Sequence, residues 1–421
     1  MQFKQYPSYK NSGVEWLGDV PEHWSVIPSK FYFIERKEKA ENTDKQLTAS
    51  QKHGIIFQED FMAENGRVMV VMKNPEILKK VRPNDFVISM RSFQGGLELS
   101  YLEGSISSAY VMLKPNLNVV DIEYFKYLFK TPRYIQSLQS TSNLIRDGQA
   151  LRFNNFSQIK LVLPPKADQE KIVSFLDTET SRIDNLIAKQ EKLIELLEEQ
   201  RKSIISHAVT KGLNPNAPMK DSGVEWLGEV PESWVEQKIK FISKLINEKT
   251  SEKSNVIALE NIESWTGKYI ETESSFESDA VKFKKNDVLF GKLRPYLAKV
   301  YLVENQGEAV GDIYVLRPNK LIHPQFLKFF MLSEKFIDYV NSSTNGTKMP
   351  RANWDFIGCI SIFLPHIKVQ HEIVEYLESA VLKIELIINK QISLIEKLKE
   401  YRSSIISHAV TGKIDVREFG A

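Results

Sequence analysis

The sequence predicts an α+β protein in which two similar mixed α/β domains are separated by two long helices that pair as an antiparallel coiled coil, with an internal pseudo-twofold repeat. Two repeated segments lead to this prediction. Residues 163–210 return as residues 364–411, and 24 of the 48 aligned positions are identical. Residues 12–24 (SGVEWLGDVPEHW) return as residues 222–234 (SGVEWLGEVPESW), with 11 of 13 positions identical. Repeats of this length indicate the architecture directly.

Each copy of the longer repeat is predicted to form one long helix. Both copies open with Leu-Pro, at 163–164 and 364–365, and proline is tolerated only near a helix start. Gly212 and Gly412 follow the last predicted turns, where a C-cap glycine is expected. Apolar residues recur at heptad spacing over a length typical of coiled coils. The predicted seam consists of Leu176, Ile183, Leu186, Leu193, Leu197 and Ile204 in the first copy and Leu377, Ile384, Ile387, Leu394, Leu398 and Ile405 in the second.

The order of the segments predicts that the two helices run antiparallel. The first helix leads away from one globule, and the second buries its seam over the shortest path by running back along the first. At a rise of about 1.5 Å per residue, each helix would span roughly 60 Å. Gln190 and Gln391 occupy equivalent seam positions and should meet near the middle, where a polar residue can fix helix register. The alternative is that both are seam residues partly open to water.

The repeats divide the chain into four predicted segments: a first domain at 1–165, a central helical spacer at 166–212, a second domain at 213–365 and a C-terminal helical spacer at 366–421. The two domains are expected to share one order of strands and amphipathic helices. In the first, strands are predicted at 68–72, 85–91, 109–113 and 159–163, with helices at 121–130 and 133–141. In the second, which follows a linker at 211–220, strands are predicted at 256–259, 287–292, 298–303, 313–316 and 359–363, with a helix at 324–332.

Composition and motifs argue against several classes of protein. No apolar run is long enough to span a membrane, and residues 1–11 lack the apolar core of a signal peptide. The single cysteine, Cys359, excludes a disulfide framework and fits a reducing cytosol, and we interpret it as a buried strand residue. We find no phosphate loop, no His-Glu-x-x-His and no Ser/His/Asp arrangement. His207 and His408 lie in the last helical turns, where they complement the helix dipole.

The distribution of charge directs any nucleic-acid contact to the globules. Residues 168–210 carry a net charge of −3 and residues 369–410 a net charge of −1, so the rest of this chain of net charge +2 carries +6. Segments of negative charge are unsuited to lie along phosphates. The tryptophans of the short repeat, Trp16 and Trp24 in the first copy, are expected to pack, because two base-reading surfaces should differ more than these two copies do.

Each globule also has polar loops whose side chains suit DNA. Arginine pairs bidentately with guanine edges and Asn or Gln with adenine edges, while lysine and amides beside glycine suit phosphate. The alternative is that surface loops are polar in any case. The candidate DNA-binding residues are Arg91, Gln94, Arg146, Gln149, Arg152 and Asn154 in the first globule and Lys292, Arg294, Tyr296, Thr347, Lys348, Arg351 and Asn353 in the second.

The paired SGVEWLGxVPExW segments, the Leu-Pro junctions followed by Gln169 and Gln370, and the paired SIISHAVT ends resemble the specificity subunit of type I restriction–modification systems. The resemblance covers essentially the whole chain, in the order recognition domain, central helix, recognition domain, C-terminal helix. It implies that each domain reads one half of a split target in double-stranded DNA and that the helices set the gap between the halves.

The resemblance also implies the partners. Two methyltransferase subunits would dock on the two helical repeats, and up to two restriction subunits would join them, in the cytoplasm and without a membrane. The specificity subunit has no active site and binds no cofactor. Its partners methylate adenine with S-adenosylmethionine and use ATP and Mg²⁺ for cleavage.

Two other functions compete with this hypothesis. A two-headed DNA-binding regulator would share the polar loops but would not explain two matched helical repeats, and it would form no complex with a methyltransferase. An adaptor whose globules bind proteins would differ in salt dependence, because DNA binding weakens steeply as salt rises. An enzyme that acts alone is the least favoured alternative.

Overall fold

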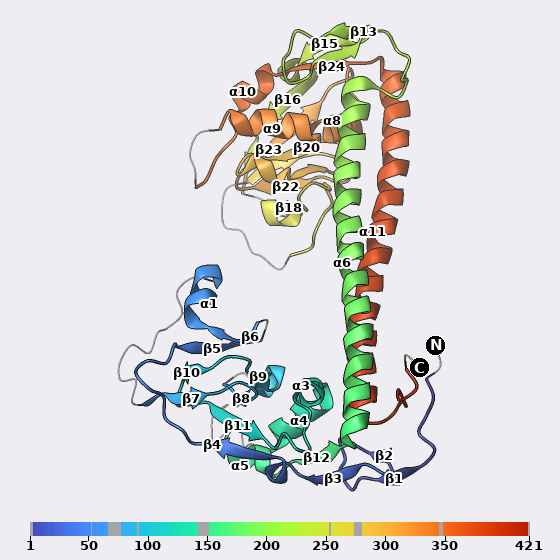
Figure 1. Cartoon of the computed structure of the whole chain (residues 1–421). Coiled ribbons are helices and arrows are strands. Elements are labelled where there is room, and N and C mark those ends of the chain that lie inside the picture. The colour runs from blue at the N-terminus through green and yellow to red at the C-terminus, as the bar shows by residue number, and fades with distance from the viewer. Residues whose placement is uncertain are drawn as a thin grey trace. The chain divides into compact units, whose positions relative to one another are not determined.

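The computed structural model describes residues 3–51, 53–65, 77–90, 92–141, 151–251, 254–272, 280–344 and 348–419 (Figure 1). The chain forms two compact units. We call Met1–Ala188 with Leu394–Ala421 unit 1, and Lys189–Ser393 unit 2. Each unit contains one globule and a stretch of both long helices. None of the described helices has a segment both long and apolar enough to cross a membrane.

Unit 1 is built around a four-stranded antiparallel sheet in the order β4 (Phe33–Arg36), β11 (Val111–Pro115), β8 (Phe86–Ile88), β9 (Glu98–Leu99). Helices α3 (Ile122–Leu128) and α4 (Pro132–Ser140) follow β11 and contribute to the same core. The ring of Phe33 lies 5.2–5.8 Å, centroid to centroid, from those of Phe86, Phe125, Phe129 and Phe156. These elements confirm the predicted strands at 85–91 and 109–113 and both predicted helices.

Two-stranded antiparallel ribbons and short helices complete the described part of unit 1. The ribbons are β1 (Tyr9–Asn11) with β2 (Asp19–Pro21), β3 (Ser25–Pro28) with β12 (Lys160–Leu163), β5 (Leu47–Ser50) with β6 (Gly54–Phe57), and β7 (Lys79–Val81) with β10 (Gly104–Ile106). The short helices are η1 (Ser29–Phe31), α1 (Gln58–Asn65), α2 (Ser92–Gly95) and α5 (Phe153–Ser157). The predicted strand at 68–72 lies outside the described residues, whereas β12 confirms the closing strand.

Unit 2 repeats the central sheet, in the order β16 (Ser243–Ile246), β23 (Ile313–Pro318), β20 (Val288–Gly291), β21 (Val300–Leu302). A second sheet has the order β17 (Lys249–Thr250), β19 (Ala280–Phe283), β22 (Gly307–Val310), β18 (Val256–Ile257), and only its β22–β18 pair is parallel. The ribbons are β13 (Met219–Asp221) with β14 (Glu229–Pro231) and β15 (Val235–Lys238) with β24 (Ser361–Leu364). The described helices of this globule are α7 (Ile239–Ile242), η3 (Leu259–Asn261), η4 (Pro295–Leu297), α8 (Pro324–Met331), α9 (Glu334–Ser342) and α10 (Trp354–Cys359).

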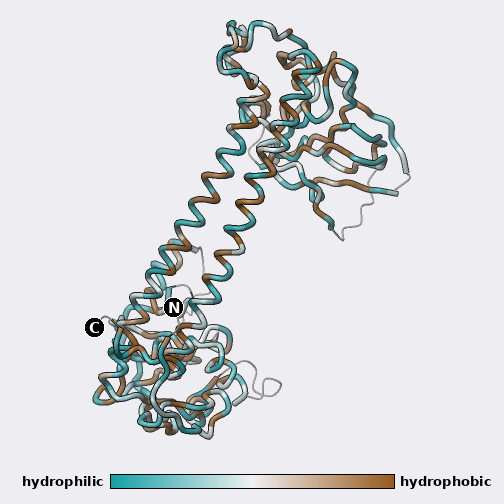
Figure 2. The backbone as a smooth tube through the Cα atoms, turned by 90° about the vertical axis from the view of Figure 1, so that its right-hand side faces the viewer, coloured by the Kyte–Doolittle hydropathy of each residue, from teal (hydrophilic) through white to brown (hydrophobic). Residues whose placement is uncertain are grey.

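The two long helices are α6 (Lys166–Lys211) and α11 (Ile367–Val410), and hydrophobic positions recur along both (Figure 2). In unit 1 the early part of α6 meets the late part of α11, where Arg402 Nε lies 2.8 Å from Asp184 Oδ1. In unit 2 the late part of α6 meets the early part of α11, where Leu197 clusters with Ile384 and Ile388. The predicted antiparallel pairing is therefore confirmed in each unit.

The predicted seam is wrong at three positions. Leu193 and Ile387 in unit 2 are 39% and 41% exposed, and Leu394 in unit 1 is 41% exposed. The neighbouring isoleucines are less exposed, since Ile388 and Ile395 are buried and Ile194 is half-buried. Two apolar residues stand next to each other along the helix at each of these places, so heptad counting could not choose between them. Gln190 and Gln391 are both half-buried, and no hydrogen bond joins them in the part of the chain that the structure describes.

The short repeat packs against the end of a long helix in each unit. Trp24 and Trp234 are buried, as the packing interpretation expected. Gly412 follows α11 with a φ of +72°, and a Cβ there would lie 2.3 Å from Cδ of Pro21. Gly212 follows α6 with a φ of +79° and faces Trp234. Both glycines therefore serve a left-handed C-cap, and Gly412 also permits a close approach.

The interpretation of Cys359 as a buried strand residue is wrong. Cys359 is exposed and is the last residue of α10, and β24 begins two residues later, at Ser361. The run of apolar residues from 356 to 364 is short, and periodicity does not separate helix from strand over such a length.

Candidate nucleic-acid interface

In unit 2 the two predicted DNA-binding loops lie side by side. The loop after β20 begins at Lys292, and the segment that precedes α10 includes Arg351. The Arg294 amide donates a hydrogen bond to the Pro350 carbonyl at 2.8 Å, and Leu293 pairs with Arg351 in an isolated β-bridge. Backbone contacts thus hold two loops that are more than fifty residues apart in sequence on one surface of unit 2.

One carboxylate organises the cations on this surface. Asp312 Oδ1 lies 3.7 Å from Lys292 Nζ, and Asp312 Oδ2 lies 3.0 Å from Arg351 Nη2. Arg294 is exposed with a left-handed φ of +52°, and it forms no ion pair among the described residues. Tyr296 is also exposed, which leaves its ring available for stacking. Two of the predicted cations, Lys292 and Arg351, share this one acidic partner, so the surface suits phosphates and guanine edges. Lys348, also predicted, is exposed in the same segment as Arg351.

In unit 1 three of the six candidates can be placed. Gln94 is exposed in α2, and Arg152 is the exposed N-cap of α5, where its amide donates to Asn155 Oδ1 at 2.9 Å. Asn154 is exposed in the first turn of α5. No hydrogen bond or ion pair in the described ranges joins Gln94 to the other two. Arg91, Arg146 and Gln149, like Thr347 of unit 2, lie outside the described residues.

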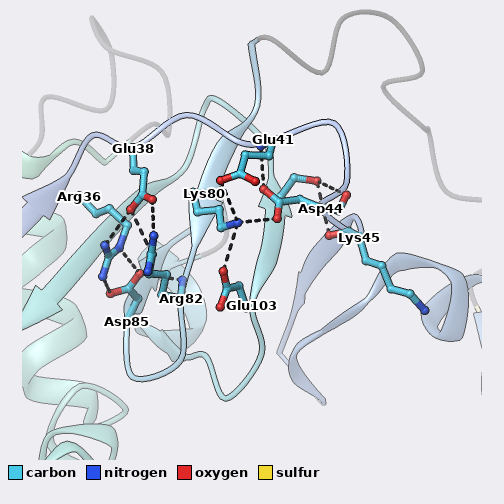
Figure 3. Close-up of polar contacts among 10 residues, drawn as sticks. Arg36, Glu38, Glu41, Asp44, Lys45, Lys80, Arg82, Asp85 and Glu103 are labelled. Atoms are coloured by element: carbon cyan, nitrogen blue, oxygen red, sulfur yellow. Dashed lines mark hydrogen bonds and ion pairs between the residues drawn. The ribbon is translucent and has the colours of Figure 1, made fainter.

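A second set of charges in unit 1 is paired internally (Figure 3). Lys80 is only 4% exposed, and its Nζ lies 2.5 Å from Asp44 Oδ1 and 3.1 Å from Glu103 Oε1. The hydrogen bond to Asp44 raises the pKa of Lys80. Burial opposes ionisation of Asp44, but the hydrogen bond from Lys80 and a backbone amide outweigh it and lower the pKa of Asp44. These charges satisfy one another, so we interpret the set as structural and not as a phosphate contact.

The two units anchor the same buried carboxylate with arginines from different strands. In unit 1 Asp85, which precedes β8, receives bidentate hydrogen bonds of 2.6 and 2.9 Å from Arg36 on β4. In unit 2 Asp287, which precedes β20, receives bidentate hydrogen bonds of 2.8 and 2.7 Å from Arg317 on β23. The carboxylate is therefore common to both globules, whereas the guanidinium is supplied independently.

Unit 1 has a pocket between its globule and the late part of α11. The volume is about 860 Å³. Lys126 and Tyr127 of α3, Glu98 of β9 and Arg402 of α11 are among the residues that line it. Burial raises the pKa of Glu98, against a hydrogen bond from Lys130. The pocket is lined by charged groups of both signs and by apolar groups.

In unit 2 the corresponding place is filled by a hairpin of the globule, residues 262–270. Ile262 and Tyr269 form a β-bridge across it. Trp265, at its tip, has the Nζ of Lys202 4.2 Å from its ring centroid, and Lys202 is the counterpart of Ser403 in the pocket of unit 1. Lys268 Nζ lies 2.8 Å from Glu385 Oε2 of α11. The hairpin therefore ties the globule of unit 2 to both long helices.

Each unit also exposes a Lys-Phe pair that sequence reasoning missed. Phe31 is 63% exposed with Lys30 Nζ 5.6 Å from its ring centroid, and Phe241 is 61% exposed with Lys240 Nζ 5.5 Å away. The two pairs are separated by 210 positions, the same offset as the short repeat, so extending that alignment could have found them. An exposed aromatic residue that recurs in both globules is a candidate contact for a partner that binds twice.

Apolar side chains also remain exposed along the long helices of each unit. In unit 2 they include Leu193, Leu196, Leu382, Leu386, Ile387 and Ile392, and in unit 1 Leu394 and Tyr401. Exposed apolar side chains of this kind are candidates for contact with another protein.

Comparison with known proteins agrees with these features. The model of the family described as the type I restriction modification DNA specificity domain matches residues 79–198 and 231–397. The MjaVIII specificity subunit of a type I restriction enzyme from Methanocaldococcus jannaschii is 27% identical over 94% of each chain. The EcoDI specificity subunit from Escherichia coli is 24% identical over 63% of this chain and 64% of that protein.

Solved structures show the same fold. A chain from a study of complex assembly and conformational transition in the type I restriction–modification system has a TM-score of 0.68 at 13% identity, covering 93% of this chain and 98% of that one. The HsdS subunit from Thermoanaerobacter tengcongensis has a TM-score of 0.57 at 13% identity, covering 94% and 98%. The duplicated sheet, the paired long helices and the two family matches lead to one conclusion: this chain belongs to the family of type I restriction–modification DNA specificity subunits.

Proposed function

We propose that each unit reads one half of a bipartite DNA target and that the long helices set the gap between the halves and dock two methyltransferase subunits. The observation that carries this proposal is the contrast within the duplication. The two globules share a four-stranded sheet order, whereas their exposed loops differ in sequence. Two readers with one framework and different loops fit two different half-sites.

The surfaces that recur in both units support docking of one partner in two copies. Leu193 of unit 2 and its repeat counterpart Leu394 of unit 1 are both exposed, and both suit packing against helices of another chain. The exposed pairs at Phe31 and Phe241 add an equivalent contact on each globule. A protein with this duplicated surface would bind two methyltransferase subunits, with up to two restriction subunits joining them.

The chemistry is assigned to the partners. In this proposal the chain recognises DNA and catalyses nothing, while the methyltransferase subunits hold S-adenosylmethionine and transfer its methyl group to adenine. The restriction subunits would use ATP and Mg²⁺. The relatives named above are specificity subunits, which agrees with a recognition role.

The test is to map methylated adenines in the DNA of cells that express this chain together with its methyltransferase partner. We expect methylation at one bipartite sequence with a constant gap, and none in cells that lack this chain. Methylation of a contiguous sequence, or a pattern that does not change when the chain is omitted, would contradict the proposal.

A further inference from the structure

Two buried glutamines occupy the same place in the two units. Gln169 lies in the first turn of α6 and Gln370 in the first turn of α11, and both side chains are fully buried. They are separated by 201 positions, the offset of the long repeat. A buried amide without hydrogen-bond partners is destabilising. The partners of these two side chains therefore indicate which parts of the fold they connect.

In unit 1 the Gln169 amide joins three backbone atoms. Its Oε1 accepts a hydrogen bond from the Asp121 amide at 2.8 Å. Its Nε2 donates to the Val119 carbonyl at 2.9 Å and to the Pro164 carbonyl at 2.8 Å. Residues 119 and 121 belong to the loop between β11 and α3, so one side chain connects the sheet and the following helix of the globule to the start of α6.

In unit 2 the Gln370 amide makes the same three hydrogen bonds. Its Oε1 accepts from the His323 amide at 2.8 Å. Its Nε2 donates to the Leu321 and Pro365 carbonyls, each at 3.0 Å. These residues belong to the loop between β23 and α8 and to the junction before α11. The arrangement is therefore repeated bond for bond.

The chemistry of the amide explains why glutamine is retained while the neighbours vary. A glutamine side chain has two N–H donors and a carbonyl acceptor, and here both donors and the acceptor are used. All six partners are backbone atoms. The donor position can therefore be Asp121 in unit 1 and His323 in unit 2 without loss of a hydrogen bond. Glutamate would lack the donors, and a methionine of similar length would make none of the three bonds.

We propose that Gln169 and Gln370 are positioning residues that fix the orientation of each globule on its long helix, and that they thereby restrict the complex to one gap between the half-sites. This inference rests on the proposed function, because a gap has meaning only for a bipartite target. A globule that can rotate on its helix presents its loops to DNA over a range of positions, so other gaps become acceptable.

The experiment uses the full chain in complex with its methyltransferase partner. DNA duplexes carry the two half-sites at the wild-type gap or with one base pair more or fewer. We expect the wild type to methylate the altered gaps poorly, and expect Gln169→Met and Gln370→Met to reduce this discrimination about 10-fold, as the loss of buried hydrogen bonds would. Methylation at the wild-type gap should change less than the discrimination does.

Matched controls make the same chemical change elsewhere in the same unit. Gln136→Met in unit 1 alters an exposed residue of α4, and Gln325→Met in unit 2 alters a half-exposed residue of α8. Both variants should keep the wild-type gap preference. Hydrogen exchange at the amides of residues 121 and 323 reports directly on the hydrogen bonds to the glutamines, because each amide loses its acceptor in the corresponding glutamine variant.

A gentler variant decides the question if a glutamine variant loses its cooperative melting transition. His323 has a φ of −69°, which proline adopts, so His323→Pro removes the one N–H that binds Gln370 Oε1. His323→Ala removes the same ring but keeps the N–H. The inference expects a broadened gap preference for the proline variant and not for the alanine variant.

The outcomes separate the two proposals. Suppose that the wild type methylates DNA with one gap only, and that the folded glutamine variants are equally stringent although amide exchange at residue 121 or 323 has risen. The positioning role is then overturned and the proposed function stands. If the wild type methylates no bipartite target, the proposed function fails and this inference fails with it.

Discussion

Unit 1 and unit 2 share a sheet order but differ where each globule meets its long helices. In unit 1 this place is a pocket of about 860 Å³ lined by Lys126 and Arg402. In unit 2 the hairpin at 262–270 fills it, with Trp265 against Lys202. The duplicated framework therefore keeps the order of strands and the helix junctions, while each unit fills the space beside the helices in its own way.

The two buried carboxylates also combine a shared position with a different partner in each unit. Asp85 and Asp287 hold the same place before a central strand, yet Arg36 reaches the first from β4 and Arg317 reaches the second from β23. The register shows that Lys114 on β11 corresponds to Arg317. A buried carboxylate needs a cation, which comes from the adjacent strand β23 in unit 2 and from β4, the strand beyond the adjacent one, in unit 1.

The largest expected effect comes from moving the arginine of unit 1 from β4 to β11, the strand that corresponds to β23 of unit 2. Arg36→Ile leaves Asp85 buried without its partner and should lower the free energy of unfolding of unit 1 by about 3 kcal/mol. Adding Lys114→Arg supplies the guanidinium from β11, as unit 2 does, and should recover most of the loss. Denaturant unfolding of the wild type and both variants measures this. A double variant as unstable as the single one would show that the two solutions cannot be exchanged.

Removing the hairpin's aromatic anchor should have the next largest effect. Trp265→Ala deletes a ring that packs on the core of unit 2 and makes a cation–π contact with Lys202. We therefore expect a loss of about 2 kcal/mol in the free energy of unfolding. Tyr269→Ala, at a more exposed position of the same hairpin, is the control and should cost less. If both changes cost the same, Trp265 is not what holds the hairpin to the helices.

A functional comparison asks whether the two units read DNA independently. Arg294→Ala should weaken binding to the second half-site about 10-fold, because an arginine paired with a base edge contributes on that scale, and Arg152→Ala should do so only at the first. Competition binding of the methyltransferase complex with DNA altered in one half-site or the other measures each contribution. Loss of both half-sites from a single change would show that the units do not act separately.

The smallest expected effect is a pH dependence found in the pocket of unit 1. Burial raises the pKa of Glu98 above its ordinary value of 4.5. Since the folded-state value lies above the unfolded one, its favourable contribution to stability is complete below pH 4.5 and is lost as pH rises through the folded-state pKa. Relative to Glu98→Gln, the wild type should therefore lose stability over that window. A difference that grows in favour of the wild type would contradict the sign.

The repeats made the long helices, their direction and the helix junctions predictable, because these follow from residues close in sequence and from matched copies. The position of the seam was not predictable from spacing. Leu193 and Ile194 both suit an apolar row, and only the side chains of the opposite helix select one of them. Cys359 was misplaced because a short apolar run is compatible with helix or strand.

Residue type predicts the candidate DNA-binding residues, but it does not predict how they are arranged relative to one another. The bond between Arg294 and Pro350 joins loops that are far apart in sequence, and Asp312, which pairs with Lys292 and Arg351, lies outside both loops. The shared Lys-Phe pairs were present in the alignment at the offset of 210, but their exposure became known only in the folded unit.

The amino-acid sequence alone determined the duplication and the two long helices, because internal repetition and helix periodicity can be read directly along the chain. Tertiary structure decided which apolar row is buried, which strand supplies the arginine for each carboxylate, and whether a hairpin or a pocket lies beside the helices. Each of these depends on contacts between residues remote along the chain, where several partners satisfy the same chemistry and packing selects one.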